Sequence, residues 1–150
     1  MNINDSTVLE KLIFIPPSAD KKYYPDGYYR LHPSAAKAYI SFYNAAKSAG
    51  FNWTLSSAYR SRQHQAGLGS SSTVASPGSS PHGWGGAVDI QQLYSAQGGT
   101  KNLGPVAHKR VRDTSPLWQW LDTNGPSYGW YNPSRMRNGA GAESWHFEYR

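Results

Sequence analysis

The absence of cysteine is the feature that most constrains how this chain can fold. With no disulfide available, its 150 residues must be held together chiefly by a hydrophobic core, and 21 of them are aromatic (6 Trp, 11 Tyr and 4 Phe). A chain of this length buries roughly 68–70% of the surface that its unfolded form exposes, which suits one compact domain. The sequence therefore predicts a single domain over residues 1–150 with a core rich in Tyr and Trp.

The net charge of the chain indicates which classes of molecule it can bind. Lys and Arg outnumber Asp and Glu by 15 to 9, and the resulting net charge of +6 admits anionic partners such as nucleic acids or acidic polymers. The basic residues are scattered, with no run longer than two, which favours a solvated basic surface over a nucleic-acid-binding face. We therefore expect no nucleic-acid partner.

Hydropathy predicts neither a membrane span nor a secretory signal. The longest apolar run, from Leu12 to Ile15, has four residues, whereas a transmembrane helix needs about 20. The first six residues lack the basic and apolar stretches of a signal peptide. If the protein acts outside the cytoplasm, we expect something other than its own N-terminus to take it there.

Two helices are indicated by start signals, stop signals and apolar spacing. Pro33 and Ser34 open the first, and Gly50 follows its end. Its apolar residues recur at steps of three and four and predict one buried stripe, made of Ala36, Tyr39, Phe42, Tyr43, Ala46 and Ala49. The second helix begins at Ser115-Pro116 and ends at Gly125, with Leu117, Trp118 and Leu121 facing inward.

Short strands are predicted at 51–57, 87–90, 128–131 and 145–149, without a βαβ rhythm. Strands and helices in this order predict an α+β fold with an antiparallel sheet. A further short helix is expected from Ser61 to Gln65, and residues 1–30 are expected to form an N-terminal extension. In segment 67–81, eleven of fifteen residues are Gly, Ser or Pro, which predicts a flexible loop, either a plain insertion or an active-site flap.

The segment 80–89 contains two potential metal ligands, His82 and Asp89. Without cysteine, a metal must be held by histidines and carboxylates. Seven residues of strand would separate this pair by about 23 Å, whereas both must lie within about 2 Å of a shared zinc ion. The chain between them must therefore fold back, and that turn is eased by Gly83, Gly85 and Gly86.

A second cluster lies in segment 143–149 and adds a second imidazole, that of His146. In a strand, His146 and Glu148 point to the same face, because side chains repeat every two residues. Two neutral imidazoles and one carboxylate would leave a bound Zn²⁺ with a charge of +1 and an open fourth position, which is typical of a catalytic site.

The remaining carboxylates of this cluster suit two supporting roles. Glu143 is expected where the chain enters the last strand, close to the metal without binding it. From there it can take a proton from a metal-activated water and pass it to a leaving amine. Glu148 is expected to orient one of the ligand imidazoles.

The two motifs resemble those of a known family, the VanY-type zinc D-alanyl-D-alanine carboxypeptidases and L-alanyl-D-glutamate endopeptidases, which cleave peptidoglycan stem peptides. Ser-x-His-x-x-Gly-x-Ala-x-Asp is matched from Ser80 to Asp89, and Glu-x-Trp-His-x-Glu from Glu143 to Glu148. The resemblance covers about residues 30 to 150. It implies a small antiparallel sheet flanked by helices, with one zinc ion per chain in a cleft over the sheet.

The resemblance also implies the roles of the central residues. His82, Asp89 and His146 correspond to the zinc ligands, and Glu143 corresponds to the general base and acid.

Further positions correspond to the part of the family's site that receives substrate. The family's Tyr-Arg-Ser segment is matched around Arg60, which by resemblance steadies the substrate carbonyl and the oxyanion. Gln65, Ser80 and Trp84 correspond to substrate contacts or to groups that support the ligands.

The expected function is hydrolysis of peptidoglycan stem peptides, either as a D-Ala-D-Ala carboxypeptidase or as an L-Ala-D-Glu endopeptidase. Delivery to the bacterial cell wall is expected through a lysis system or a virion, as for a phage lysin or a virion-associated protein. Besides stem peptides, the expected partners are anionic cell-wall polymers or phage tail proteins. The alternative is a non-catalytic module, stabilised by zinc, that binds the cell wall or forms part of a phage tail.

Overall fold

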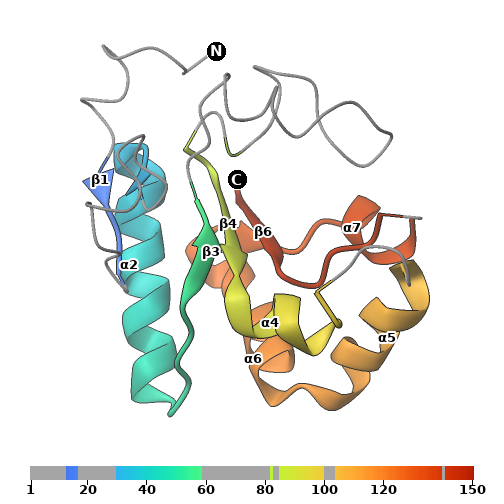
Figure 1. Cartoon of the computed structure of the whole chain (residues 1–150). Helices are drawn as coiled ribbons and strands as arrows, with labels where there is room; N and C mark the ends of the chain where they lie inside the picture. The colour runs from blue at the N-terminus through green and yellow to red at the C-terminus, as the bar shows by residue number, and fades with distance from the viewer. Residues whose placement is uncertain (1–12, 17–29, 59–81, 83–84, 100–103, 140) are drawn as a thin grey trace.

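A computed structural model of the chain describes residues 13–16, 30–58, 82, 85–99, 104–139 and 141–150. Their main feature is a four-stranded antiparallel sheet of order β3-β4-β6-β5. Its strands are β3 (Leu55–Ser57), β4 (Ala87–Ile90), β5 (Trp130–Tyr131) and β6 (His146–Tyr149). A separate antiparallel pair is formed by β1 (Ile13–Phe14) and β2 (Arg30–Leu31) (Figure 1). The fold is therefore α+β, as the sequence predicts.

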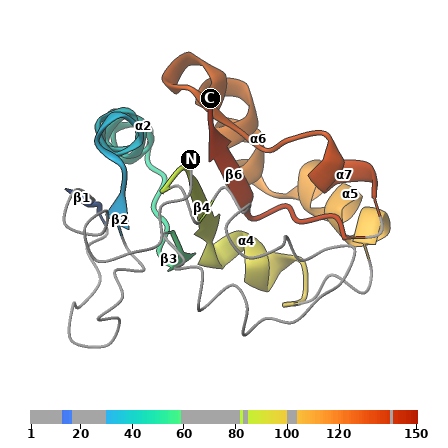
Figure 2. The same cartoon turned by 90° about the horizontal axis from the view of Figure 1, so that it is seen from above.

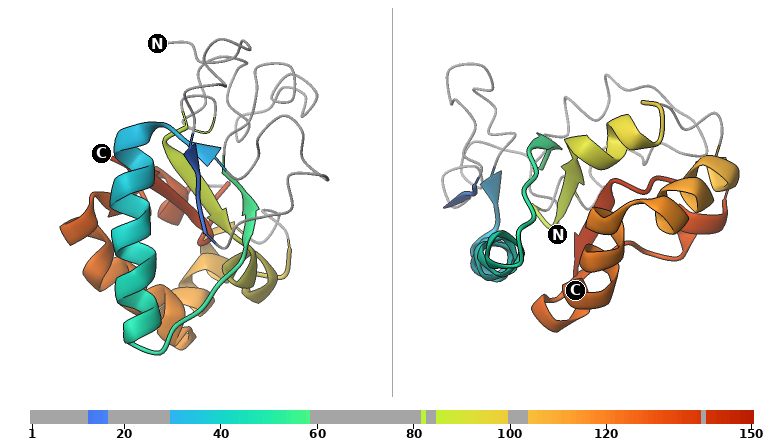
Figure 3. Two further views of the ribbon diagram at one scale, coloured as in Figure 1. Left: turned by 90° about the vertical axis from the view of Figure 1, so that its left-hand side faces the viewer. Right: turned by 90° about the horizontal axis from the view of Figure 1, so that it is seen from below.

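The helices are α2 (Pro33–Ser48), α4 (Gln91–Ala96), α5 (Gly104–Thr114), α6 (Pro116–Asn124) and α7 (Arg135–Asn138), with a 3-10 turn, η2 (Gly125–Tyr128). Helices α2 and α6 lie on one side of the four-stranded sheet (Figures 2 and 3). Among the described residues, no helix is long and apolar enough to cross a bilayer.

Helix α2 forms as its sequence predicts. The Nδ1 atom of His32 accepts a hydrogen bond from the amide of Ala35 at 3.2 Å, and Pro33 supplies a preset first turn. The helix ends before Gly50, whose φ of +89° an L side chain would strain. All but the last member of the predicted stripe are buried, so the stripe faces the core.

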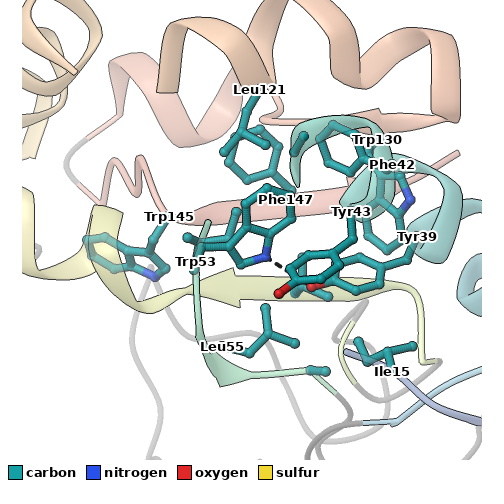
Figure 4. Packing of buried hydrophobic residues seen from close by; sticks show 14 of the residues in the cluster. Ile15, Tyr39, Phe42, Tyr43, Trp53, Leu55, Leu121, Trp130, Trp145 and Phe147 are labelled. Atoms are coloured by element: carbon teal, nitrogen blue, oxygen red, sulfur yellow. Dashed lines mark hydrogen bonds between the residues drawn. The ribbon is translucent and has the colours of Figure 1, made fainter. Parts of the chain in front are cut away.

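The core lies between these helices and one face of the sheet, and aromatic rings dominate it (Figure 4). Trp53 packs edge-on against both Tyr39 and Tyr43, and Tyr39 also meets Trp130 edge-on. From the sheet, Phe147 reaches the same cluster. The buried indole N–H of Trp53 donates to the Tyr39 hydroxyl at 2.9 Å, so this polar pair is satisfied inside the core.

The sequence-based boundaries are wrong by one residue at β6, which begins at His146, and by more at two other strands. The strand predicted at 51–57 begins only at Leu55, and Tyr128 belongs to η2 instead of the strand that follows. Gly129, at φ +83°, ends the 3-10 turn and turns the chain into β5. A Cβ at Gly129 would lie 2.8 Å from the Tyr149 ring, so glycine is also required there by space.

Three helices, α4, α5 and α7, were not predicted. Helix α5 has no wide apolar stripe, because valine is the one larger apolar residue among those it buries: Gly104, Ala107, His108 and Val111. The helix predicted at 61–65 and the loop predicted at 67–81 lie outside the described residues. Of the predicted N-terminal extension, only residues 13–16 and 30 are described, and Ile15 from it is buried in the core.

Replacing Tyr39 by phenylalanine should destabilise the protein. In Tyr39→Phe, the buried N–H of Trp53 loses its acceptor, which costs about 1–3 kcal/mol of unfolding free energy. Urea unfolding of the variant and the wild type measures this difference. Tyr43→Phe is the control, because its ring occupies the same cluster but its hydroxyl is not the partner of Trp53. Equal stabilities of the two variants would contradict the role of the Trp53–Tyr39 bond.

Candidate metal centre

Three potential metal ligands meet on the sheet face that points away from the core. In the pairing of β4 with β6, Asp89 lies opposite His146 and Val88 lies opposite Phe147. Because side chains alternate along a strand, Val88 and Phe147 enter the core while Asp89 and His146 point to the other face. His82 joins them from the chain before β4, and all three side chains are buried.

The spacing of the three ligand atoms fits a metal ion. His82 Nε2 lies 3.2 Å from His146 Nδ1 and 3.2 Å from Asp89 Oδ1, and the last two atoms are 3.1 Å apart. Ligand atoms about 2.0–2.1 Å from one tetrahedral zinc ion lie about 3.3–3.4 Å from one another. The three atoms therefore have nearly the spacing of one face of a zinc coordination tetrahedron. Within the described part of the chain, this is the group that can hold a metal ion.

Hydrogen bonds on the far side of each ring fix which nitrogen faces the cluster. The Nδ1–H of His82 donates to the backbone carbonyl of Ala58 at 2.5 Å. The Nε2–H of His146 donates to Glu148 Oε1 at 3.0 Å. These acceptors favour the tautomers in which each imidazole would present a lone pair to a bound metal ion.

The charge states of Asp89 and His146 also suit a metal. Burial alone would raise the pKa of Asp89, but the neighbouring imidazoles of His82 and His146 outweigh it and lower that pKa below its ordinary value. Burial lowers the pKa of His146, against the opposing effect of Asp89. At neutral pH the cluster therefore offers an ionised carboxylate and a neutral His146 imidazole, the forms that bind metals.

Glu148 is held in place behind His146 by an arginine. Both of its carboxylate oxygens accept from the Arg135 guanidinium, and the Oε2 contact is 3.2 Å. Arg150 adds a weaker ion pair at 3.7 Å. His146 and Glu148 thus share one face of β6, as the two-residue spacing predicts.

The expected chain reversal between His82 and Asp89 is present. The amide of Gly85 donates to the carbonyl of His82 at 3.1 Å, and Gly85 has a φ of +66°, which favours glycine. Strand β4 then carries Asp89 back beside His146. Asp89 therefore lies on the strand that leaves the turn, as the spacing predicts.

Glu143 lies in the segment between α7 and β6, close to the metal cluster but not part of it. It is 7% exposed, and its charge acts to raise the pKa of His146. Its amide donates to the carbonyl of Met136 at 2.8 Å, and its carbonyl accepts from Asn132 Nδ2 at 2.9 Å. This places Glu143 at the entrance to the last strand, where the sequence predicts it.

Sequence reasoning missed two polar residues that hold this segment, Asn132 and Gln97. Asn132 also donates to the carbonyl of His146 at 2.7 Å, and its Oδ1 accepts from the buried ring of His108 at 2.9 Å. Gln97 forms hydrogen bonds to the backbone of Ala142 and Ser144, the two neighbours of Glu143. Neither lies in a motif, because each acts through backbone atoms that every residue carries. Arg60, Gln65, Ser80 and Trp84, predicted to contact substrate, lie outside the described residues.

The chain belongs to the VanY family, described as D-alanyl-D-alanine carboxypeptidase, whose sequence pattern matches residues 28–150. No curated protein matches the chain.

Solved structures share its fold. The LdcB LD-carboxypeptidase, described for its recognition of peptidoglycan, has a TM-score of 0.66 and 22% identity over 99% of this chain and 70% of its own. The vancomycin-resistance D,D-pentapeptidase VanY with Zn(II) has a TM-score of 0.61 and 18% identity over 99% and 86%. VanYB with D-alanine-D-alanine has a TM-score of 0.59 and 20% identity over 92% and 76%. These likenesses establish the α+β fold.

The buried His108 should make stability depend on pH. Burial lowers the pKa of His108 below its ordinary value of 6.5, so near that pH the unfolded chain binds more protons than the folded one. Stability therefore falls as the pH drops below about 6.5, by up to ~1.4 kcal/mol per pH unit for this group.

In His108→Gln, the new amide can still donate to Asn132 but does not titrate. Urea unfolding at pH 7 and pH 5 should show a smaller loss of stability in the variant than in the wild type. The same loss in both proteins would show that His108 does not contribute to the pH dependence.

Proposed function

We infer that this protein is a zinc peptidase that hydrolyses the stem peptides of peptidoglycan. One observation supports it most directly: two imidazoles and one carboxylate converge with metal-ligand spacing, beside a buried glutamate outside the group. Membership of a carboxypeptidase family supplies the substrate class.

His82, Asp89 and His146 would hold one zinc ion through the three atoms whose distances are given above. Zinc bound by two neutral imidazoles and one carboxylate carries a net charge of +1, and it supplies a Lewis acid that lowers the pKa of a bound water to about 7.

Glu143 acts as the general base and then as the general acid. Its carboxylate takes a proton from the attacking water and returns it to the nitrogen of the leaving amine when the peptide bond breaks. Its burial beside His146 keeps it near the reacting atoms and out of bulk solvent. A glutamate in this position has no use in a site that only stabilises the fold.

We assign Arg60 to binding the substrate carbonyl, where its guanidinium would stabilise the negative charge that develops on the oxygen. Gln65, Ser80 and Trp84 are assigned to the surroundings of the substrate. The roles of Arg60, Gln65 and Ser80 rest on the match to the family's motifs, and that of Trp84 on its place between His82 and Gly85 in the same segment.

Glu148 keeps the His146 ring in the tautomer that binds metal. Its carboxylate accepts the Nε2–H of His146, and the ion pair with Arg135 fixes the carboxylate in turn. A carboxylate partner of this kind raises the basicity of a ligand imidazole.

The bond cleaved is either the terminal D-Ala-D-Ala bond or the internal L-Ala-D-Glu bond. The first requires a group that captures a free carboxylate, and the second requires an open groove. Delivery to the wall by a lysis system or a virion completes the proposal. The alternative function, a zinc-stabilised module that binds the wall or belongs to a phage tail, predicts zinc binding without hydrolysis.

Zinc should stabilise the wild-type protein and fail to stabilise Asp89→Asn. At a free zinc concentration one hundred times the dissociation constant, binding to the folded state adds about 2.7 kcal/mol. The melting temperature of chelator-treated protein, measured with and without added zinc, gives the shift. The asparagine cannot supply an anionic ligand, so its shift should be close to zero.

Two further variants control this titration. Glu148→Gln keeps all three ligands and should weaken zinc binding by about 10–100-fold. Asp113→Asn changes an exposed carboxylate of α5 and should bind zinc as the wild type does. An unchanged zinc shift in Asp89→Asn would remove Asp89 from the ligand set.

Glu143→Gln should nearly abolish hydrolysis while zinc stays bound. An amide cannot accept the proton of the attacking water, and the loss of general-base catalysis typically costs about 10²–10⁴-fold in rate. The assay incubates zinc-loaded protein with purified muropeptides and follows the products by mass spectrometry. Full activity in Glu143→Gln would refute the mechanism.

The same spectra separate the two specificities. Loss of one terminal alanine identifies a carboxypeptidase, and scission after L-Ala identifies an endopeptidase. Zinc-loaded wild-type protein that releases neither product would favour the non-catalytic module.

A further inference from the structure

Gln97 is a buried glutamine that the proposed mechanism does not use. It caps the C-terminus of α4, its side chain is fully buried, and it lies more than forty residues before the segment it contacts. Its Nε2 donates to the carbonyl of Ala142 at 2.8 Å, and its Oε1 accepts from the amide of Ser144 at 2.8 Å. The two bonds therefore fall on the two neighbours of Glu143.

This side-chain amide reproduces a strand contact. In a parallel ladder, a residue bonds to the carbonyl before and the amide after the residue it faces. Gln97 makes this pair of bonds around Glu143. In such a pairing, the N–H and C=O of the faced residue point to the opposite side. The amide and carbonyl of Glu143 do so, and they bond to the Met136 carbonyl and to Asn132.

We call residues 142–144 the Glu143 segment. Its backbone is fixed on both sides, although it belongs to no helix or strand. Its backbone polar groups have partners within the protein: the carbonyl of Ala142, the N–H and carbonyl of Glu143, and the amide of Ser144. Removing one partner would leave a buried polar group unsatisfied, so the segment would move to recover a bond.

The three metal ligands are held by other contacts. His82 bonds to Ala58, Asp89 and His146 are paired in the sheet, and His146 also bonds to Glu148. The Gln97 side chain bonds instead to the backbone of the Glu143 segment, at the carbonyl of Ala142 and the amide of Ser144.

We propose that Gln97 is a positioning residue for Glu143: it sets where the general base stands relative to the metal centre without contributing to metal binding. The inference rests on the proposed function, because it gives Gln97 a role in the proton transfer assigned to Glu143. Asn132 differs from Gln97, because it bonds to the carbonyls of both Glu143 and His146 and so supports the base and a ligand together.

The test compares Gln97→Met with Gln92→Met. Methionine is close to glutamine in size but makes neither bond. Gln92 lies on the same helix and also bonds through both ends of its amide, to the backbone and hydroxyl of Thr54 at 2.7 and 3.1 Å. The control therefore removes the same type of side chain and a comparable pair of bonds, at an exposed position whose bonds go to Thr54 and not to the Glu143 segment.

Gln97→Met should lower kcat for muropeptide hydrolysis by about 10–100-fold, because a small displacement of a catalytic group is enough for such a loss. KM and zinc affinity should stay within about twofold of the wild-type values. The visible spectrum of the cobalt-substituted protein should be unchanged. Gln92→Met should leave kcat within about twofold of the wild type. Rates are taken per folded, metal-loaded molecule, well below the melting temperatures.

Gln97→Asn answers the same question if the methionine variant does not fold. It keeps an amide in the interior but is one methylene too short to bond on both sides of Glu143, so kcat should again fall at unchanged zinc affinity. A normal kcat in a folded Gln97 variant, or a loss of zinc affinity as large as the loss of kcat, would overturn the role of Gln97 and leave the proposed function standing. A zinc-loaded wild type that hydrolyses no muropeptide would overturn the proposed function and this inference with it.

Discussion

The antiparallel pairing of β4 with β6 is the constraint on which the rest of the site depends. It places Asp89 opposite His146 and Val88 opposite Phe147, so one register assigns the apolar side chains to the core and the ligands to the other face. A slip of one residue would exchange the two faces and bury the ligands among aromatic rings. The packing of Phe147 and Val88 in the core is therefore also what holds the potential metal ligands Asp89 and His146 in register.

Buried amides extend this order beyond the sheet. The loop that follows α7 has no ladder of its own, yet Asn132 and Gln97 supply it with backbone partners from two directions. His108 completes the arrangement by donating to Asn132. The oxygen and the nitrogen of both side-chain amides are hydrogen-bonded, and buried amides satisfied in this way help to specify one geometry. The loop can in this way be as well fixed as a strand without being one.

Much of the fold, and the convergence of His82, Asp89 and His146, could be predicted from the sequence, because the signals are local. The stripe of α2 repeats at helical spacing, and Gly85 permits the turn that the distance from His82 to Asp89 requires. Helix α5 could not be predicted, because Val111 is the one larger apolar residue among those it buries, which makes no recognisable stripe. Gln97 and Asn132 could not be predicted either, since their partners are backbone groups more than ten residues away, which leave no pattern in the sequence.

The two imidazoles of the cluster are supported by different acceptors. His82 donates its distal N–H to a neutral peptide carbonyl, whereas His146 donates its own to a carboxylate. Partial proton sharing with an anion makes a ring a stronger electron donor than sharing with an amide does. The two imidazoles therefore differ in donor strength, and a cation bound between them would interact more strongly with the His146 ring than with the His82 ring.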